Sequence, residues 1–213
     1  MTAILASSGG GGTPTAQQAN QAAALVASAR RAIASASSVF VTGSVDSGGQ
    51  VIGLQLKLAN GQGGEGTMVV RGASIQLIVV HGRGYMTTTA AGWRRLAGAN
   101  GAEIGALLNG SWISLPPTGE FSSLFKLTSQ NVLFAHLLAS HGTFVRGSTT
   151  TLDGEHVISV TNTATGGTLY IATTGPPYPV EITKSGPNAG TVRFSNENQP
   201  VHLAAPPHSI SLP

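Results

Sequence analysis

From Gly142 to its end, the chain is a succession of short runs rich in β-branched and aromatic residues, with turn residues between them. Apolar and polar residues alternate within several of these runs, as in half-buried strands. The predicted strands span 143–146, 156–161, 168–172, 179–183, 191–194 and 200–204. Consecutive short strands joined by tight turns are typical of an antiparallel sheet, so this pattern largely fixes the fold class.

The first half of the chain adds further strands after a helical segment. Ile52, Leu54, Leu56 and Leu58 alternate with less apolar residues, which predicts a strand with one buried face. Residues 60–66 are glycine-rich and predict a turn into the next strand, at 67–71. Residues 75–80 are apolar at nearly every position, which predicts a strand covered on both faces. With a short strand at 111–115, about ten strands are expected, enough to curl into an open half-barrel.

Two regions have helical spacing. The first follows a possible cap at Thr13 or Thr15, and its apolar stripe consists of Ala22, Leu25, Val26, Ala29, Ile33 and Ala36. The second, at 118–139, is interrupted and rich in Leu and Phe, and 102–108 could add a turn or two. Interrupted apolar helices between strands of one sheet predict a lid over its concave face. The alternative is ordinary core helices with no cavity beneath them.

The predicted fold class is therefore α+β. A strongly curved antiparallel sheet, an open half-barrel of about ten strands, carries an N-terminal helix and lid helices on its concave side.

Motifs that could indicate catalysis occur in the wrong context. Residues 61–66 match G-x-G-x-x-G, but strand-like residues follow them, whereas a dinucleotide site needs a helix there. Residues 123–126 match S-x-x-K beside the S-x-N of 129–131, too close together for a penicillin-recognising enzyme. Asp46 and Asp153 adjoin glycines, so turn chemistry explains them better than a catalytic triad does. We therefore predict that the chain is not an enzyme.

The charge and composition of the chain exclude several classes of partner and cofactor. The net charge is only +3 and the basic residues are scattered, which gives no footprint for nucleic acid. The chain has no cysteine, and its histidines lack the paired spacing and acidic partner of a zinc site. No metal and no other cofactor are expected.

The N-terminus predicts a membrane anchor. Residues 4–8 read Ile-Leu-Ala-Ser-Ser and resemble a bacterial lipobox in which Ser8 replaces the lipidated cysteine. The residues before it are too few for a signal peptide. Residues 1–13 would then be a flexible tether, the remnant of a lipoprotein leader, because Gly9 to Gly12 form a glycine linker. A start methionine before a low-complexity tail is the alternative.

Several C-terminal segments, in this order and spacing, resemble those of LprG/LppX-type cell-envelope lipoproteins, which are relatives of the LolA-like carriers. They are Gly167-Thr168-Leu169-Tyr170, Tyr178-Pro179-Val180-Glu181-Ile182, and the closing Pro200-Val201 with Ala205-Pro206-Pro207. The resemblance extends from about Val39 to the end. It implies that 14–213 form a single LolA/LprG-like domain with an apolar pocket for acyl chains.

The resemblance also implies a function. It predicts a lipid-binding or lipid-carrier domain, extracytoplasmic and anchored in the cell envelope, whose partners are an acylated lipid or glycolipid, a membrane surface and a membrane transporter. The residues expected to line the cavity are Ile52, Leu54, Leu56, Met68, Val70, Ile75, Leu77, Val79, Leu124, Phe125, Leu133 and Leu137. The alternative is an envelope-anchored binding or scaffold domain whose core is filled by its own side chains.

Overall fold

The computed structural model describes residues 15–116, 118, 122–138 and 142–211. Its helices are α1 (Ala16–Ser35), α2 (Ala90–Leu96), α3 (Gly101–Leu108), α4 (Ser122–Thr128) and α5 (Gln130–Leu137), with a short 3-10 helix η1 (Gly98–Asn100). Its strands are β1 (Ser38–Ser47), β2 (Gln50–Ala59), β3 (Gly63–Val70), β4 (Ala73–Val80), β5 (Arg83–Thr88), β6 (Ile113–Leu115), β7 (Phe144–Leu152), β8 (Glu155–Asn162), β9 (Thr168–Ala172), β10 (Pro179–Lys184), β11 (Gly190–Ser195) and β12 (Ile210–Ser211).

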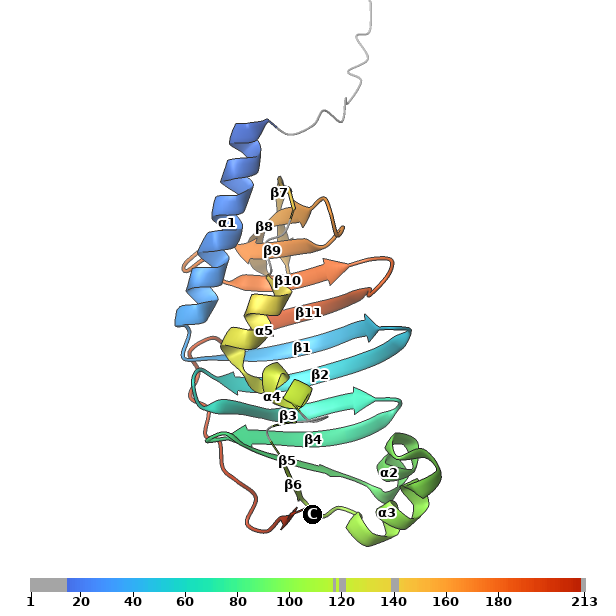
Figure 1. The fold of residues 1–213 in the computed structure, drawn as a ribbon. Coiled ribbons are helices and arrows are strands. Elements are labelled where there is room, and N and C mark those ends of the chain that lie inside the picture. Colours follow the sequence, from blue (N-terminus) through green and yellow to red (C-terminus); the bar gives the residue numbers. More distant parts are fainter. Residues whose placement is uncertain (1–14, 117, 119–121, 139–141, 212–213) are drawn as a thin grey trace, which may run out of the picture.

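The strands form a single open sheet of twelve strands in the order β12-β6-β5-β4-β3-β2-β1-β11-β10-β9-β8-β7. All neighbours pair antiparallel except β12 and β6, which are parallel. Helices α1, α4 and α5 lie on one face of the sheet, and α2 and α3 lie at one end (Figure 1). The predicted α+β class, with a curved antiparallel sheet and helices on its inner face, is confirmed.

Pairing of β1 with β11 joins the two halves of the chain. Phe40 lies opposite Ser195 and Val45 opposite Gly190, so segments about 150 residues apart form the centre of the sheet. The rest of the sheet consists mostly of hairpins between consecutive strands. The β1–β11 pair therefore joins two meanders, each formed by strands that are close together in the sequence.

Helix α1 is built as the sequence predicts. The Thr15 hydroxyl accepts from the Gln18 backbone N–H while the Gln18 side chain accepts from the Thr15 N–H, which is a capping box. The stripe that faces the sheet is buried at Ala22, Val26, Ala29, Ile33 and Ala36, and Leu25 is half-buried. Since these side chains are mostly small, the helix axis comes close to β7–β10.

Helix α4 is fixed to the sheet by close contacts. The ring of Phe125 lies on Gly84 of β5, where a Cβ would come within 2.6 Å of it. A Cβ on Gly64 of β3 would lie 3.2 Å from the carbonyl oxygen of Thr128. These two glycines let α4 pack directly on the backbone of the sheet.

The structure corrects three expectations about local structure. Gly63–Gly66 were predicted in a turn but form the first half of β3; at Gly66, φ is 155° and a Cβ would collide with the carbonyl oxygen of Gln55. Residues 200–204 were predicted as a strand but are irregular, since Pro200 has no N–H to donate. The outer face of β4 is only partly covered, because Gln76 is exposed and Ile78 is half-buried.

Candidate functional site

A cavity of about 480 Å³ lies between α1, the end of α5 and the inner face of the C-terminal half of the sheet. Its apolar walls are Val26 of α1, Leu137 and Leu138 at the end of α5, and Val45, Phe144, Val160, Leu169, Ile182 and Val192 of the sheet. The volume falls within the range of roughly 300–1,000 Å³ of small-molecule sites. The walls of this space are mostly apolar.

Side chains at alternate positions of β8, β9, β10 and β11 face the cavity. Val160 lies beside Leu169 on β8 and β9, and Leu169 lies opposite Ile182 of β10, which in turn lies opposite Val192 of β11. One cross-strand row of apolar side chains therefore forms the floor. Gly190 continues the next row, between Lys184 and Val45. A Cβ at Gly190 would come 2.5 Å from the carbonyl oxygen of Ser44, so glycine allows β11 and β1 to approach closely.

Polar groups gather at the ends of the same strands. Asp46, Asn162, Thr165, Lys184 and Asn188 contribute to the cavity wall. Two of these side chains stabilise the loops that follow their strands. Asp46 Oδ1 accepts from the Gly49 N–H at 2.7 Å, and Asn162 Oδ1 accepts from the Ala164 N–H at 2.9 Å. The site thus combines an apolar interior with a polar rim, which suits an amphipathic molecule.

This rim lies on one edge of the sheet. The strands β1, β3, β5, β8 and β10 all end there, and β2, β4, β9 and β11 begin there, as their antiparallel registers require. We call it the mouth edge and define it by the connections 48–49, 71–72, 163–167 and 185–189, together with α2 and α3. It lies on the right in Figure 1.

The residues predicted to line a cavity occupy two places in the structure. Leu137 lies in the wall of the cavity described above. Eight others lie on β2, β3 and β4, where Leu54, Leu56, Met68, Ile75, Leu77 and Val79 are buried and Ile52 and Val70 are half-buried. On α4 and α5, which occupy the region predicted to form a lid and are called the lid helices below, Leu133 is buried, Phe125 is half-buried, and Leu124 belongs to α4. Ser8 lies outside the described residues.

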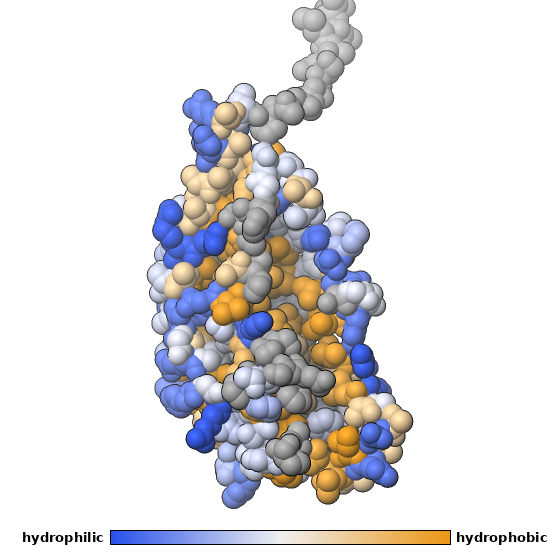
Figure 2. Space-filling model, viewed as in Figure 1, coloured by the Kyte–Doolittle hydropathy of each residue, from blue (hydrophilic) through white to orange (hydrophobic). Residues whose placement is uncertain are grey.

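The two sets are connected by one cross-strand row. Val45, in the cavity wall, lies opposite Ile52, and Ile52 is followed on β3 by Val70. All three are half-buried apolar side chains. Figure 2 shows apolar surface beside the lid helices on this face of the molecule. An apolar track therefore leads from the cavity along the mouth edge.

Sequence reasoning did not select the C-terminal walls of the cavity. Val160, Leu169, Ile182 and Val192 all lie on predicted strands, and their alternation was available as a signal. Alternation identifies the face that points inward. It carries no information about whether a helix fills the space above that face.

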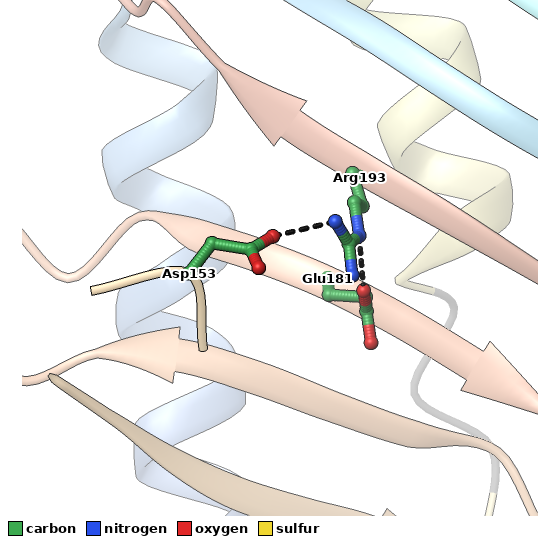
Figure 3. Close-up of polar contacts among 3 residues, drawn as sticks. All are labelled: Asp153, Glu181 and Arg193. Atoms are coloured by element: carbon green, nitrogen blue, oxygen red, sulfur yellow. Dashed lines mark hydrogen bonds and ion pairs between the residues drawn. The ribbon is translucent and has the colours of Figure 1, made fainter. Parts of the chain in front are cut away.

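The outer face of the same strands carries an ion-pair network. Arg193 Nε lies 2.5 Å from Glu181 Oε2, and Arg193 Nη1 lies 2.5 Å from Asp153 Oδ2 (Figure 3). Glu181 and Arg193 alternate with Ile182 and Val192, so they point away from the cavity. The two carboxylates raise the pKa of Arg193, Glu181 most strongly. Glu181 is buried, and this bond compensates its charge.

No arrangement for metal binding is found among the described residues: they contain no group of three His, Cys, Asp or Glu side chains placed to hold an ion. No helix in the described part of the chain is long and apolar enough to cross a membrane.

Solved structures with the same fold are known. LprF from Mycobacterium bovis superimposes with a TM-score of 0.63 at 14% identity, over 92% of this chain and 99% of that chain. The Mycobacterium tuberculosis lipoprotein LppX gives 0.57 at 15% identity, over 87% and 99%. No family model matches the chain. No curated protein sequence matches it either. The similarity to the LprG/LppX type is thereby confirmed for the fold.

Proposed function

We propose that this chain is a non-enzymatic lipid-binding or lipid-carrier domain that holds acyl chains between its sheet and its helices. The observation that carries the proposal is the cavity of about 480 Å³, with Val26, Leu137, Leu169 and Val192 among its walls. Its apolar interior suits hydrocarbon, and its polar rim suits a lipid head group. The fold shared with the lipoprotein LppX supports the same function.

Burial of hydrocarbon supplies the driving force. An acyl chain of about 15 methylenes gains on the order of 12 kcal/mol on leaving water, before ordering costs. A guest of that length can extend from the cavity along Val45, Ile52 and Val70. The buried positions on β2–β4, with Phe125 and Leu133 of α4 and α5, become accessible to a second chain if these two helices move away from the sheet.

We further propose that residues 14–213 form one domain, and that residues 1–13 are a tether to a lipid anchor at the position of Ser8. The domain would then act at the cell envelope, on the outer side of the membrane. It would exchange an acylated lipid or glycolipid with the membrane surface or with a membrane transporter.

Extraction of the purified protein, followed by mass spectrometry, tests the proposal. Co-purified acyl lipid, or saturable uptake of a fluorescent long-chain fatty acid by delipidated protein, is the expected result. A clean extract together with no uptake would overturn it.

A scaffold domain is the second candidate, and the close packing of α4 favours it. The ring of Phe125 packs directly on the backbone of Gly84, where α4 meets the N-terminal half of the sheet. A domain of this kind would bind other proteins and take up no lipid. The same uptake measurement therefore separates the two functions.

A further inference from the structure

We propose that the mouth edge docks on an anionic lipid bilayer, so that the cavity opens directly onto the membrane. The inference extends the proposed function by naming the surface with which the cavity exchanges its guest. Three features of the edge carry it: exposed apolar side chains, an excess of cations, and the position of the cavity rim.

Exposed apolar side chains are concentrated at this edge. Among the described residues, the exposed large hydrophobic side chains are Val51, Val69, Leu107 and Ile210. Val51 lies near the start of β2, Val69 near the end of β3, and Leu107 in the last turn of α3, where it is 79% exposed. Three of the four thus lie at or beside the edge where the cavity opens; Val51 and Val69 alternate with Ile52 and Val70, so they point to the outer face of the sheet there. Such side chains would be buried in the interfacial region of a bilayer.

Cations surround these apolar positions. Arg94 and Arg95 lie in the last turn of α2, and Arg71 lies at the tip of the β3–β4 turn. The side chain of Arg95 passes within 3.9 Å of the Cβ position of Gly72, which places α2 against that turn. Lys184 adds a cation at the cavity rim. The mouth edge carries only two acidic residues among those described, Asp46 and Glu103, so cations are in excess there. Apolar tips among arginines fit a negatively charged lipid surface.

The cavity rim shares the edge. Lys184, Asn188 and Asp46 line the cavity beside the loops that would meet the bilayer. A guest could then move between membrane and cavity without entering water. Exposure of its acyl chain to water would be unfavourable because of the hydrophobic effect. Docking at this edge is also compatible with an N-terminal tether, since a tether constrains distance more than orientation.

Co-sedimentation of the full chain with vesicles tests the docking. Two vesicle types are compared, phosphatidylcholine alone and phosphatidylcholine mixed with phosphatidylglycerol, at low and high salt. We expect binding to the anionic vesicles that weakens at high salt. The double variant Arg94→Gln/Arg95→Gln should bind about tenfold more weakly, and Leu107→Gln several-fold more weakly.

The chain offers matched controls. Arg30→Gln/Arg31→Gln removes the other adjacent arginine pair, on α1 away from the mouth edge, and Ile210→Thr removes the exposed apolar side chain that lies elsewhere. Both should bind vesicles as the wild type does. Absence of vesicle binding, equal binding to both vesicle types, or equal losses in the controls would overturn the proposal. Equal binding to both vesicle types would indicate a contact that does not depend on lipid charge, and equal losses in the controls would indicate a contact that is not specific to this edge.

Fatty-acid uptake in vesicle-free solution separates this inference from the proposed function. A variant that takes up the fluorescent fatty acid normally but fails to bind vesicles supports the docking edge. A wild type that binds anionic vesicles but takes up no fatty acid overturns the carrier function and leaves the docking supported.

Discussion

The side-chain amide of Gln130 donates from Nε2 to the backbone carbonyl of Ile33 at 2.9 Å, and the same nitrogen lies 2.9 Å from the carbonyl oxygen of Ala36. Gln130 is the first residue of α5, and the two carbonyls lie at the C-terminal end of α1. The last carbonyls of a helix lack the partners that the next turn would supply, and here the Ile33 carbonyl accepts only a 3.3 Å bond from the Ala36 N–H within the backbone. The buried amide of Gln130 therefore caps the first helix, together with the amide of Asn60, which donates to the Ala34 and Ala36 carbonyls, and Gln130 also ties α5 to the end of α1.

Replacement of Gln130 by Met tests this connection. The variant keeps the volume of the side chain but removes both donors, so we expect the free energy of unfolding to fall by about 1–2 kcal/mol. Urea denaturation measures the change. Asn131→Ala is the control, because Asn131 is exposed and its 3.3 Å bond to Asn60 is a surface contact. Similar losses in both variants would show that the cap contributes no special stability.

The contact of Phe125 with Gly84 predicts that even alanine is poorly tolerated at 84. Its Cβ would lie 2.6 Å from the ring, so the Phe125 ring or α4 itself must shift, at a cost of about 1–3 kcal/mol. Gly53→Ala is the matched strand control, since its Cβ would meet Val69 at an ordinary 3.4 Å. Combining Gly84→Ala with Phe125→Leu should recover part of the loss in a double-mutant cycle. Additive losses would contradict the contact.

Local patterns in the sequence predict much of this fold. The stripe from Ala22 to Ala36 identifies α1, and the alternation at Ile52–Leu58 identifies the buried face of β2. Helix α2 was missed, although Thr89 supplies its cap by accepting from the Gly92 N–H. Pairing of β1 with β11 and of β6 with β12 depends on contacts between distant residues, which no local period encodes. The cavity depends on the space left between α1 and the sheet, a property of packing that alternation does not specify.

Replacement of Glu197 by a neutral residue should stabilise the folded protein, by an amount that depends on pH. Burial raises its pKa above the ordinary 4.5, and the nearby charge of Glu155 adds to the shift. Since the folded state binds this proton more tightly than the unfolded state, the carboxyl stabilises the fold only at low pH, and this contribution is lost as pH rises through the raised pKa. Glu197→Gln should therefore raise the melting temperature at pH 7.

The difference between Glu197→Gln and the wild type should shrink as pH falls below about 4.5, where the carboxyl is protonated in both states. Thermal unfolding followed by circular dichroism at several pH values measures it. A constant difference across that range would contradict the assigned shift.

Replacing different residues of the ion-pair network on the outer face should change the melting temperature by different amounts. Arg193→Met leaves the buried carboxylate of Glu181 without its 2.5 Å partner, so we expect a clear fall in melting temperature. Asp153→Asn removes a carboxylate from an exposed turn and should change it little. The double variant Arg193→Met/Glu181→Leu should regain stability, because no charge is then left buried. Failure to regain it would show that packing of Arg193, and not its charge, matters.

A larger side chain in the cavity wall should block lipid uptake. Val45 lies on the inner face of β1 and lines the cavity, whereas its neighbour Ser44 is exposed on the opposite face. Val45→Phe adds a ring where the guest would lie, and we expect at least a several-fold loss of fatty-acid uptake. Stability should change by less than about 1.5 kcal/mol, since empty space receives the ring. Ser44→Phe, in the same strand, should leave uptake unchanged. If both variants retained full uptake, the guest would bind outside this cavity; if Val45→Phe instead unfolded the protein, the space at Val45 would already be filled.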